Sequence, residues 1–529
     1  MLIDRLFTEI HALSPAGAIK SFFTALVIAG VGYWLFSDTV KFYLGSGGDK
    51  PLRVSFAATS EEFEVWKQML DAFREKYPDI PVKGEFIPAR YEQKVQQLMV
   101  ADDAADVILY QDEPFFQMVE SGKFEDLMPY MLESNHTGDG AKDLSDLKKR
   151  YWATAMESFG RYEGEGDQQQ WRQYAVPVWS GCNLIFYNKA AFELAEIRVQ
   201  KHEGPDAIRE LPDGSWLLDD ERWTISDFVH VCQRLTIDTD GDGKPNQYGT
   251  TLPPWIYWQT MHWTIGAHLL TSDKKHTLAY GPACEASYQL YQNLRWKYGV
   301  VPTPADLGTM TERTGFFTGL ASMITDGPWG MPFCNAVAEE GLAYGLMHLP
   351  RNDQTGYRAT RVTWDGLAMY TGSTKKQEAW LLIEYLSSEA SQRAIARLQR
   401  AVPAKRPPDD VIERAILRGE PTDADNQYAA VLFTTINPAV DSRKFIQATL
   451  EYGRLQPITE HWDVMTHAWA DALDGLQRID PAKRYTPAEA IGRFYAEKGD
   501  ARKLKQLLPP LDPTAADVYR DIYEKSQKP

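Results

Sequence analysis

Cysteine is scarce in this sequence. The 529 residues include only four cysteines, namely Cys182, Cys232, Cys284 and Cys334. They are too few and too widely spaced for a disulfide scaffold, and the absence of any CxxC pair excludes the common zinc and thiol redox motifs. One disulfide in an oxidising compartment stays open as an alternative, but we expect buried thiols.

Catalytic signatures are also lacking. The sequence contains no GxSxG, HExxH, GxGxxG or phosphate-loop motif, and its ten histidines are scattered without metal-ligand spacing. A glycoside hydrolase would need two carboxylates about 5–10 Å apart across a cleft, and Asp326 with Asp365 is the pair that could serve. We therefore predict that the protein is not an enzyme, with glycoside hydrolysis as the alternative.

Positive charge is in deficit. The 56 Lys and Arg against 73 Asp and Glu give a net charge of −17, which argues against a nucleic-acid partner because phosphate binding needs clustered basic residues. In contrast, 16 Trp and 26 Tyr are many. Most of them will be core, but aromatic rings also stack on the C–H faces of sugars. The length exceeds what one core can organise and predicts two large lobes.

The N-terminal part contains a stretch without charge, residues 21–36. Flanking apolar residues extend it toward the roughly 20 residues that a transmembrane helix needs. No small-residue cleavage site follows, and no cysteine precedes Cys182 to carry a lipid. We predict a short segment at 1–20, an uncleaved membrane anchor at 21–44 and a flexible tether at 45–50. A cleaved signal or a buried core helix is the alternative.

Basic residues beside this stretch predict its orientation. Arg5 and Lys20 precede it and Lys41 follows it. Because basic residues tend to stay on the cytoplasmic side of a span, we expect the bulk of the chain on the periplasmic or extracellular side of the membrane.

Strand and helix patterns alternate after the tether. Residues 52–56, 81–86 and 106–110 have strand patterns, and residues 62–77 and 91–101 have helical spacing of their apolar side chains. A strand–helix–strand–helix–strand order is typical of a parallel sheet covered by helices. The sequence therefore predicts an α/β fold.

Ligands of such sheets bind beyond the carboxyl ends of the strands. Ser60 and Glu61 follow the first predicted strand, and Tyr110 and Asp112 lie at the end of the third. We predict these four residues at a ligand site. As alternatives, Ser60 could simply cap the following helix, and Asp112 could belong to a turn before a proline.

A Trp-bearing turn follows a short apolar strand pattern at Met323. The sequence Asp-Gly-Pro-Trp at 326–329 cannot continue a regular element, because Gly tolerates positive φ and Pro has a fixed φ and no donor. A Trp on such a turn is poorly placed for the core and well placed to line a cleft. We predict Asp326 and Trp329 as ligand-binding residues.

Several motifs occur in an order that resembles a known family. They are residues 65–82 (VWKQMLDAFREKYPDIPV), 174–189 (YAVPVWSGCNLIFYNK), 223–228 (WTISDF), 326–329 (DGPW), 373–390 (STKKQEAWLLIEYLSSEA) and 401–404 (AVPA). This order is similar to that of extracellular solute-binding proteins of carbohydrate importers, the class that includes maltose-binding protein. The resemblance covers most of residues 51–480.

The resemblance implies a periplasmic-binding-protein-like fold with two lobes around a hinged cleft. Lobe 1 would comprise residues 51–174 and 366–410, and lobe 2 residues 175–365 and 411–529. It also implies that the protein captures a sugar or oligosaccharide by lobe closure and delivers it to the permease subunits of an ABC transporter. An anchored sensor subunit without transport is the alternative, although the short N-terminal segment leaves no room for a cytoplasmic output domain.

The resemblance further implies cleft residues in the second half of the motif series. Three belong to the segment that crosses between lobes, three to a helix start rich in aromatics, and two to the returning strand: Trp179, Ser180, Asn183, Trp255, Tyr257, Trp258, Trp364 and Asp365. The family commonly has glycine at the position of Cys182. Whether the backbone at this position contacts the ligand therefore stays open.

An aspartate-rich loop begins at Asp238. Asp238, Asp240 and Asp242 occupy positions 1, 3 and 5 of a calcium-loop pattern, and Gly243 occupies position 6. Position 12 is Gly249 instead of the bidentate glutamate. The loop could bind calcium through the three carboxylates or form a turn that hydrogen-bonds to itself, and we expect no other cofactor.

Overall fold

The structure is a computed structural model that describes residues 50–57, 60–87, 90–113, 115–133, 142–338, 342–420, 427–459 and 461–527. The predicted segment 1–20, the predicted anchor 21–44 and all but the last residue of the tether lie outside these ranges. Within them, no helix is both long and apolar enough to cross a lipid bilayer.

The described chain opens with the predicted alternation of strands and helices. These elements are β1 (Leu52–Phe56), α3 (Ser60–Lys76), β2 (Val82–Phe86), α4 (Tyr91–Val100) and β3 (Val107–Gln111). Strand β1 lies between β2 and β3 and pairs parallel with both. The predicted parallel arrangement is therefore confirmed.

Helix α3 packs through one apolar face. Trp66, Leu70 and Phe73 recur every three or four residues and are buried, as expected of a helix that covers a sheet. The Trp66 ring stacks on Phe56 of β1 with 4.1 Å between ring centroids. This contact fixes the helix over the carboxyl end of the first strand.

Short helices and a hairpin lead from β3 to the long strand β6. They are α5 (Phe115–Glu120), α6 (Met128–Glu133), α7 (Leu144–Arg150), α8 (Ala153–Phe159), β4 (Gly160–Glu163), η1 (Gly166–Gln168) and β5 (Gln170–Gln173), followed by β6 (Ala175–Cys182). Every residue of β6 is buried.

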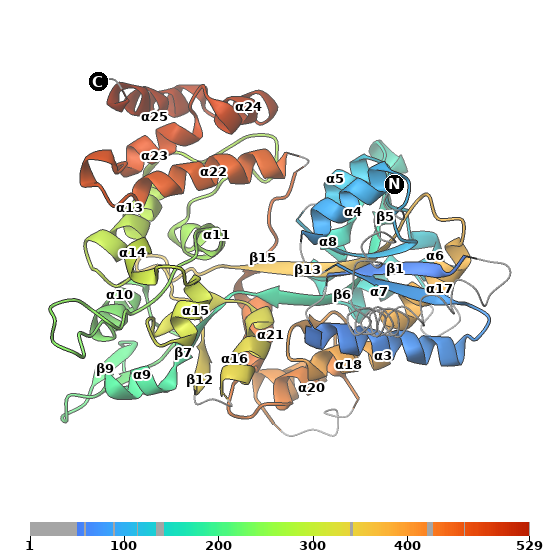
Figure 1. Ribbon diagram of the computed structural model, residues 1–529, viewed down its shortest axis with the longest axis horizontal. Coiled ribbons are helices and arrows are strands. Elements are labelled where there is room, and N and C mark those ends of the chain that lie inside the picture. The colour runs from blue at the N-terminus through green and yellow to red at the C-terminus, as the bar shows by residue number, and fades with distance from the viewer. Residues whose placement is uncertain are drawn as a thin grey trace, which may run out of the picture. The chain divides into compact units, whose positions relative to one another are not determined.

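The chain passes from one sheet to another at Asn183. Strand β6 belongs to the large sheet, and β7 (Leu184–Asn188) is the middle strand of a small antiparallel sheet with β12 (Tyr344–Met347) on one side. The chain returns through β13 (Thr360–Met369), which pairs antiparallel with β6. Figure 1 shows β6 and β13 running side by side between the two halves.

The second half contains the elements between these two crossings. They are α9 (Lys189–Leu194), β8 (Ile197–Val199), β9 (Ile208–Glu210), β10 (Trp216–Leu218), α10 (Ile225–Arg234), α11 (Pro254–Tyr257), η2 (Trp258–His262), α12 (Trp263–Ile265), α13 (Pro282–Trp296), α14 (Pro304–Leu307), α15 (Glu312–Phe317), β11 (Met323–Asp326), η3 (Pro328–Gly330) and α16 (Met331–Ala338). Helix α10 begins at a capping box, in which the Thr224 side chain accepts from the Asp227 N–H and the Asp227 side chain accepts from the Thr224 N–H.

The C-terminal part contributes to both halves. Its elements are α17 (Lys376–Leu386), α18 (Glu389–Arg397), β14 (Val402–Pro403), α19 (Asp409–Val411), η4 (Ile412–Leu417), α20 (Ala429–Thr435), α21 (Arg443–Tyr452), β15 (Gly453–Arg454), α22 (Trp462–Leu476), η6 (Pro481–Lys483), α23 (Pro487–Phe494), α24 (Gly499–Leu507) and α25 (Pro513–Ser526). In Figure 1, α22 to α25 lie together over α13, far from β1 and α3.

The large sheet has the strand order β14-β6-β13-β3-β1-β2, with β15 paired to β13. Helix α8 contacts β6 and β13, and α17 contacts β3 and β13. Gly366 of β13 allows the close approach of α8, because a Cβ there would lie 2.9 Å from the Phe159 ring. Helices therefore cover the sheet as the sequence predicts.

The proposed lobe boundaries stay a prediction. Residues 175–182 belong to the large sheet as β6, and the chain passes to the small sheet after Asn183. The reason is that β6 continues its antiparallel pairing with β13 as far as Cys182.

All four cysteines are free and buried, which confirms the expectation of buried thiols. Burial raises the pKa of the Cys182 thiol to about 12. A thiol that is neutral and enclosed is a poor nucleophile and a poor metal ligand, so Cys182 acts as a small core residue.

Replacing Trp364 should destabilise the fold. Trp364 is fully buried on β13, and its Nε1–H donates to the Thr154 hydroxyl of α8 over 3.2 Å. We expect Trp364→Ala to lower the free energy of unfolding by about 3–5 kcal/mol, because a large cavity opens between sheet and helix. Denaturant titration measures it.

The matched control is Trp255→Ala, at a side chain that is 46% exposed. It should change the free energy of unfolding by less than about 1 kcal/mol. Equal losses in the two variants would contradict the assignment of Trp364 to the core.

Candidate functional site

A large cavity lies between the two halves. Its volume is about 1120 Å³. From the half with the large sheet it is lined by α3, α4, β6, β13 and the residues after α18; from the other half it is lined by α11, η2, α15, η3, α16 and α22. Two sheets joined by long strands thus enclose a single space large enough for a ligand.

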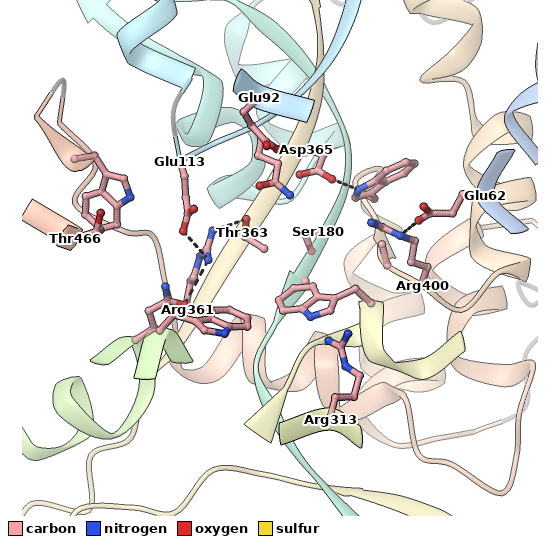
Figure 2. Close-up of a pocket in the computed structure, with 18 of the residues that line it drawn as sticks. Glu62, Glu92, Glu113, Ser180, Arg313, Arg361, Thr363, Asp365, Arg400 and Thr466 are labelled. Atoms are coloured by element: carbon pink, nitrogen blue, oxygen red, sulfur yellow. Dashed lines mark hydrogen bonds and ion pairs between the residues drawn. The ribbon is translucent and has the colours of Figure 1, made fainter. Parts of the chain in front are cut away.

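Alternate residues of β13 form the floor of this cavity. Arg361, Thr363 and Asp365 line it, whereas Val362 and Trp364 between them are fully buried on the other face. Side chains of a strand point to opposite faces with period two, which explains the division. Figure 2 shows the three cavity-facing side chains along the strand.

The neighbouring strand β6 adds Trp179 and Gly181 to the floor. The Trp179 Nε1–H donates to Asp365 Oδ2 over 2.5 Å. Ser180, between them, pairs with Trp364 of β13, so its side chain points to the core face of the sheet. Its hydroxyl is buried there and has no hydrogen-bond partner within the described ranges.

Aromatic side chains form the wall opposite the floor. Trp329 of η3 and Trp255 of α11 lie with 6.4 Å between ring centroids and 33° between their planes. Trp329 is half-buried and lines the cavity, as do Trp462 and Trp469 of α22. Such a wall offers flat apolar surfaces to the C–H faces of a ring.

Two glycines make room for the Trp329 indole. A Cβ at Gly181 would lie 2.6 Å from the Trp329 ring, and a Cβ at Gly327 would lie 2.3 Å from it. Neither glycine has a positive φ, so close approach is what the positions require. The indole is held against the backbone of β6 with one side left toward the cavity.

Asp326 holds the turn that carries Trp329. Its Oδ1 accepts from the Gly327 N–H over 2.8 Å, and its Oδ2 accepts from Arg313 Nε over 2.8 Å. Burial raises the pKa of the Asp326 carboxyl, and the Arg313 guanidinium opposes that shift. Asp326 lies behind the wall, and Arg313 is the member of the pair that lines the cavity.

Arg361 is held by carboxylates at the end of β3. Its Nη1 lies 2.8 Å from Glu113 Oε1, and its Nη2 lies 3.5 Å from Asp112 Oδ1. Asp112 also accepts from the Thr363 hydroxyl over 2.9 Å. Burial raises the pKa of Asp112 to about 6, and Arg361 opposes that shift. Figure 2 shows Glu113 and Thr363 joined to Arg361.

The third guanidinium of the cavity is paired as well. Arg400 forms an ion pair with Glu62 of α3, and its guanidinium lies 5.5 Å from the centroid of the Trp179 ring. Each arginine that lines the cavity in the described ranges therefore has a carboxylate partner from the protein itself.

Asp365 lacks such a compensating partner close to it. Burial raises the pKa of its carboxyl to about 7, and the hydrogen bond from Trp179 opposes the rise. The charges of Asp112 and Glu92 raise it further, and that of Arg361 lowers it. A carboxyl with these surroundings can carry a proton near neutral pH.

The structure brings part of the predicted site together. Trp179, Ser180, Trp255, Trp329 and Asp365 line the cavity, although the Ser180 side chain points to the core face of β6. The side chains of Ser60, Glu61 and Trp258 lie outside the described part of the chain. The role of each in ligand binding stays a prediction.

Asp112 and Asp326, predicted as direct ligand contacts, do not line the cavity. Both are buried one step behind it, where they hold Arg361 and Arg313. Carboxylates at these positions stabilise the charged guanidinium groups. Their expected effect on a ligand is indirect, because they hold the arginines that line the cavity.

Tyr110, Asn183, Tyr257 and Trp364 are buried and are not among the residues that line the cavity, and their role in ligand binding stays a prediction. The Tyr257 hydroxyl donates to the Ser287 carbonyl over 2.5 Å. Trp364 and Tyr110 lie on the core-facing side of their strands. Sequence reasoning chose them because a strand end or a helix start does not reveal which face is inside.

Sequence reasoning missed several residues of the cavity. They are Glu62, Glu92, Gln96, Gln111, Glu113, Gln259, Arg313, Arg361, Thr363, Arg400, Trp462 and Trp469. Two signals were present: Arg361 and Thr363 precede Asp365 at period two, and Trp462 and Trp469 lie seven apart on one helix. No local signal identifies Arg400.

The aspartate-rich loop is exposed and lies away from this cavity. Carboxylate oxygens of Asp238, Asp240 and Asp242 lie within 4.8 Å of one another. Both oxygens of Asp238 accept backbone N–H groups, from Gly241 over 2.7 Å and Gly243 over 2.8 Å. The loop is thus closed by its own hydrogen bonds, and calcium binding stays a prediction.

Comparison with known proteins identifies related sequences. The profile of the family described as bacterial extracellular solute-binding protein matches residues 57–393. A protein described as a putative binding protein from Brucella abortus (strain 2308) is 24% identical over 335 residues, covering 62% of this chain and 69% of that protein.

Solved structures with the same fold include an ABC substrate-binding protein and a receptor. An ABC substrate-binding protein from Listeria monocytogenes in complex with cycloalternan aligns with a TM-score of 0.64 and 19% identity, covering 86% of this chain and 97% of that one. The GacH receptor of Streptomyces glaucescens aligns with a TM-score of 0.63 and 16% identity, covering 87% of this chain and 99% of that one. Its structures are described in the unliganded form and in complex with acarbose and an acarbose homolog.

Asp365 should make stability depend on pH. Its pKa is raised in the folded protein to about 7, against about 3.9 in an unfolded chain, so between these values the folded state holds a proton that the unfolded state has lost. Stability from this group therefore falls as pH rises from about 4 to 7. At about 1.4 kcal/mol per pKa unit, the effect reaches at most about 4 kcal/mol.

We expect Asp365→Asn to be more stable than the natural protein at pH 8, with an advantage that shrinks toward pH 5. Melting temperatures between pH 5 and 8 measure this. Asp463→Asn, at an exposed carboxylate of the same cavity, is the control and should show no such trend. An advantage that is independent of pH would contradict the assignment.

Proposed function

Because the chain belongs to the bacterial extracellular solute-binding protein family, we propose that it captures a sugar or oligosaccharide outside the cytoplasm and delivers it to an ABC-transporter permease. Capture occurs by closure of two lobes over the cavity, with β6 and β13 among the connections about which they move. The protein acts as a binder and performs no chemistry on the ligand.

The observation that carries this proposal is the opposition of an aromatic wall and a polar floor. Trp255 and Trp329 offer flat apolar faces, and Arg361, Thr363 and Asp365 lie on the floor. Sugars have both kinds of surface, with C–H faces that stack and hydroxyls that need partners. A floor group left unpaired beneath a bound ligand would cost about 1–3 kcal/mol, which selects stereochemistry.

The size of the cavity supports an oligosaccharide over a single sugar. Its volume of about 1120 Å³ exceeds the roughly 300–1,000 Å³ of typical small-molecule sites. The complexes of structural relatives with cycloalternan and with acarbose agree with this size class. We therefore propose a ligand of two or more sugar rings.

We propose that residues 21–44 anchor the protein in the cytoplasmic membrane, which would keep it close to its permease. The charge-free run at 21–36 and the basic residues before it support this arrangement. Membrane fractionation tests it: the full chain should resist alkaline carbonate extraction, and a chain without residues 1–49 should be soluble. Release of the full chain by carbonate would contradict the proposed membrane anchor but would not contradict the proposed binding function.

A thermal-shift screen of the purified protein tests the binding function. The ligands are mono- and oligosaccharides, polyols and polyamines. A ligand that binds only the folded state raises the melting temperature, by the equivalent of about 2.7 kcal/mol at one hundred times its Kd. No stabilisation by any saccharide would overturn the proposal.

Incubation with the stabilising saccharide tests the absence of chemistry. Chromatography should recover it unchanged. Release of products, abolished by Asp326→Asn or Asp365→Asn, would support a glycoside hydrolase instead.

Trp329→Ala should weaken ligand binding at least tenfold, which is about 1.4 kcal/mol or more. The indole lines the cavity and its loss removes a stacking surface. Calorimetry with the stabilising saccharide measures the affinity, and the melting temperature of the free protein should change little because the ring is only half-buried.

Trp171→Ala is the matched control, since Trp171 is also half-buried but lies on β5 outside the cavity. Its ligand affinity should equal that of the natural protein. Unchanged affinity in Trp329→Ala, or unfolding of that variant, would show that the ring serves the core and not the ligand.

A further inference from the structure

Several buried polar groups beside the cavity are already used or enclosed by the protein. The Arg361 guanidinium is engaged by Glu113 and Asp112. The Trp469 Nε1–H and the Ser180 hydroxyl are enclosed, so a ligand does not reach them. Few buried groups of the cavity therefore remain as fixed hydrogen-bond partners for a ligand.

Gln259 is a buried side chain whose hydrogen-bond donors are unused. It lines the cavity and is only 2% exposed. Its Oε1 accepts from Arg361 Nη1 over 3.4 Å, which fixes the end of the amide that faces this arginine. The amide nitrogen has no hydrogen-bond partner in the described chain and is not among its enclosed atoms. Its two N–H groups are therefore open to the cavity.

A wide helical turn carries Gln259 on the cavity side. The π-helical turn η2 (Trp258–His262) lies between α11 and α12, and such turns occur frequently at functional sites. Trp255 and Gln259 both line the cavity, whereas Tyr257 and Met261 are buried in the core. A stacking ring and an amide donor therefore lie on the same side of this helical segment.

Resting on the proposed function, we propose that Gln259 is a specificity-determining residue of the ligand site. Its amide N–H groups donate to one hydroxyl oxygen of the sugar ring that stacks on Trp255. Because Arg361 already holds the amide oxygen, the donor end of the side chain is oriented before a ligand binds. The residue thus selects for an oxygen at one position of the ligand.

Burial beneath the ligand makes this contact selective. A bound sugar removes water from the amide nitrogen, so each N–H must meet an oxygen of the ligand or stay unpaired. A site that buries such a donor rejects analogues that lack the matching oxygen. Stacking on Trp255 cannot make this distinction by itself, because an aromatic ring contacts the C–H faces of a sugar and not its hydroxyls.

Monodeoxy analogues test the inference. The probes are maltotriose, mannotriose and cellotriose, each with the set of analogues that lack one hydroxyl. Calorimetry of the full-length protein should show a hydroxyl whose removal weakens binding by about tenfold or more. Gln259→Met keeps the length of the side chain but has no N–H. It should bind the parent saccharide about tenfold more weakly and prefer the parent over that analogue by less than about threefold.

A purely structural role of Gln259 would give a different pattern. If the residue only held Arg361, its loss would weaken binding of the parent and of every analogue alike. Gln456→Met is the matched control, because Gln456 is 5% exposed, donates to Glu113 of the same network over 3.0 Å and does not line the cavity. It should keep every hydroxyl preference within about threefold.

The melting temperature of each ligand-free variant checks its folding, and Gln259→Leu is the second variant if Gln259→Met does not fold. Unfolding of both would contradict the inference, because it would assign Gln259 to the core. Retention of every hydroxyl preference by a folded variant, or equal binding of all analogues by the natural protein, would contradict the inference but not the proposed sugar binding. Absence of binding by all three saccharides would contradict both.

Discussion

The alternation of side chains along β13 is the constraint on which the site depends. This strand pairs with β3 on one side and β6 on the other, and it is buried over nearly its whole length. Its odd-numbered residues Arg361, Thr363 and Asp365 face the cavity, while Trp364 fills the space against α8. A shift by one residue would exchange core and ligand surface completely.

Charge in the cavity follows from the same arrangement. Placing Arg361 on a buried strand requires anionic partners, and Asp112 and Glu113 at the end of β3 supply them. In the same way, Glu62 forms an ion pair with Arg400 and Asp326 forms one with Arg313. The protein thus pairs its own cavity arginines with carboxylates in the absence of a ligand. The carboxyl groups without such a partner are the acidic groups left in the cavity.

The sequence predicted the sheet better than it predicted the site. The period-two and helical patterns located β1 to β3 and their helices closely, because burial of one face dominates such short elements. The Trp329 turn was found because Gly and Pro restrict the backbone there. These features are local, and a local pattern is enough to reveal them.

The cavity residues that were missed depend on contacts between distant segments. Arg400 reaches its place only because the chain after α18 passes Glu62. Trp462 arrives with α22, which lies near the opposite end of the chain from α3 (Figure 1). Tyr257 and Trp364 show the opposite case, because each is an aromatic residue at a predicted point of the chain whose side chain is buried. Neither kind of information is present in spacing alone.

The crossing strand β13 connects the floor of the cavity to both halves. Arg361 lies between the halves, 2.8 Å from Glu113 of one and 3.4 Å from Gln259 of the other, and Gln456 donates to the same Glu113 over 3.0 Å. The floor of the cavity is therefore tied to both halves by the same side chain of β13, and a change in the position of either half would be felt first at Arg361.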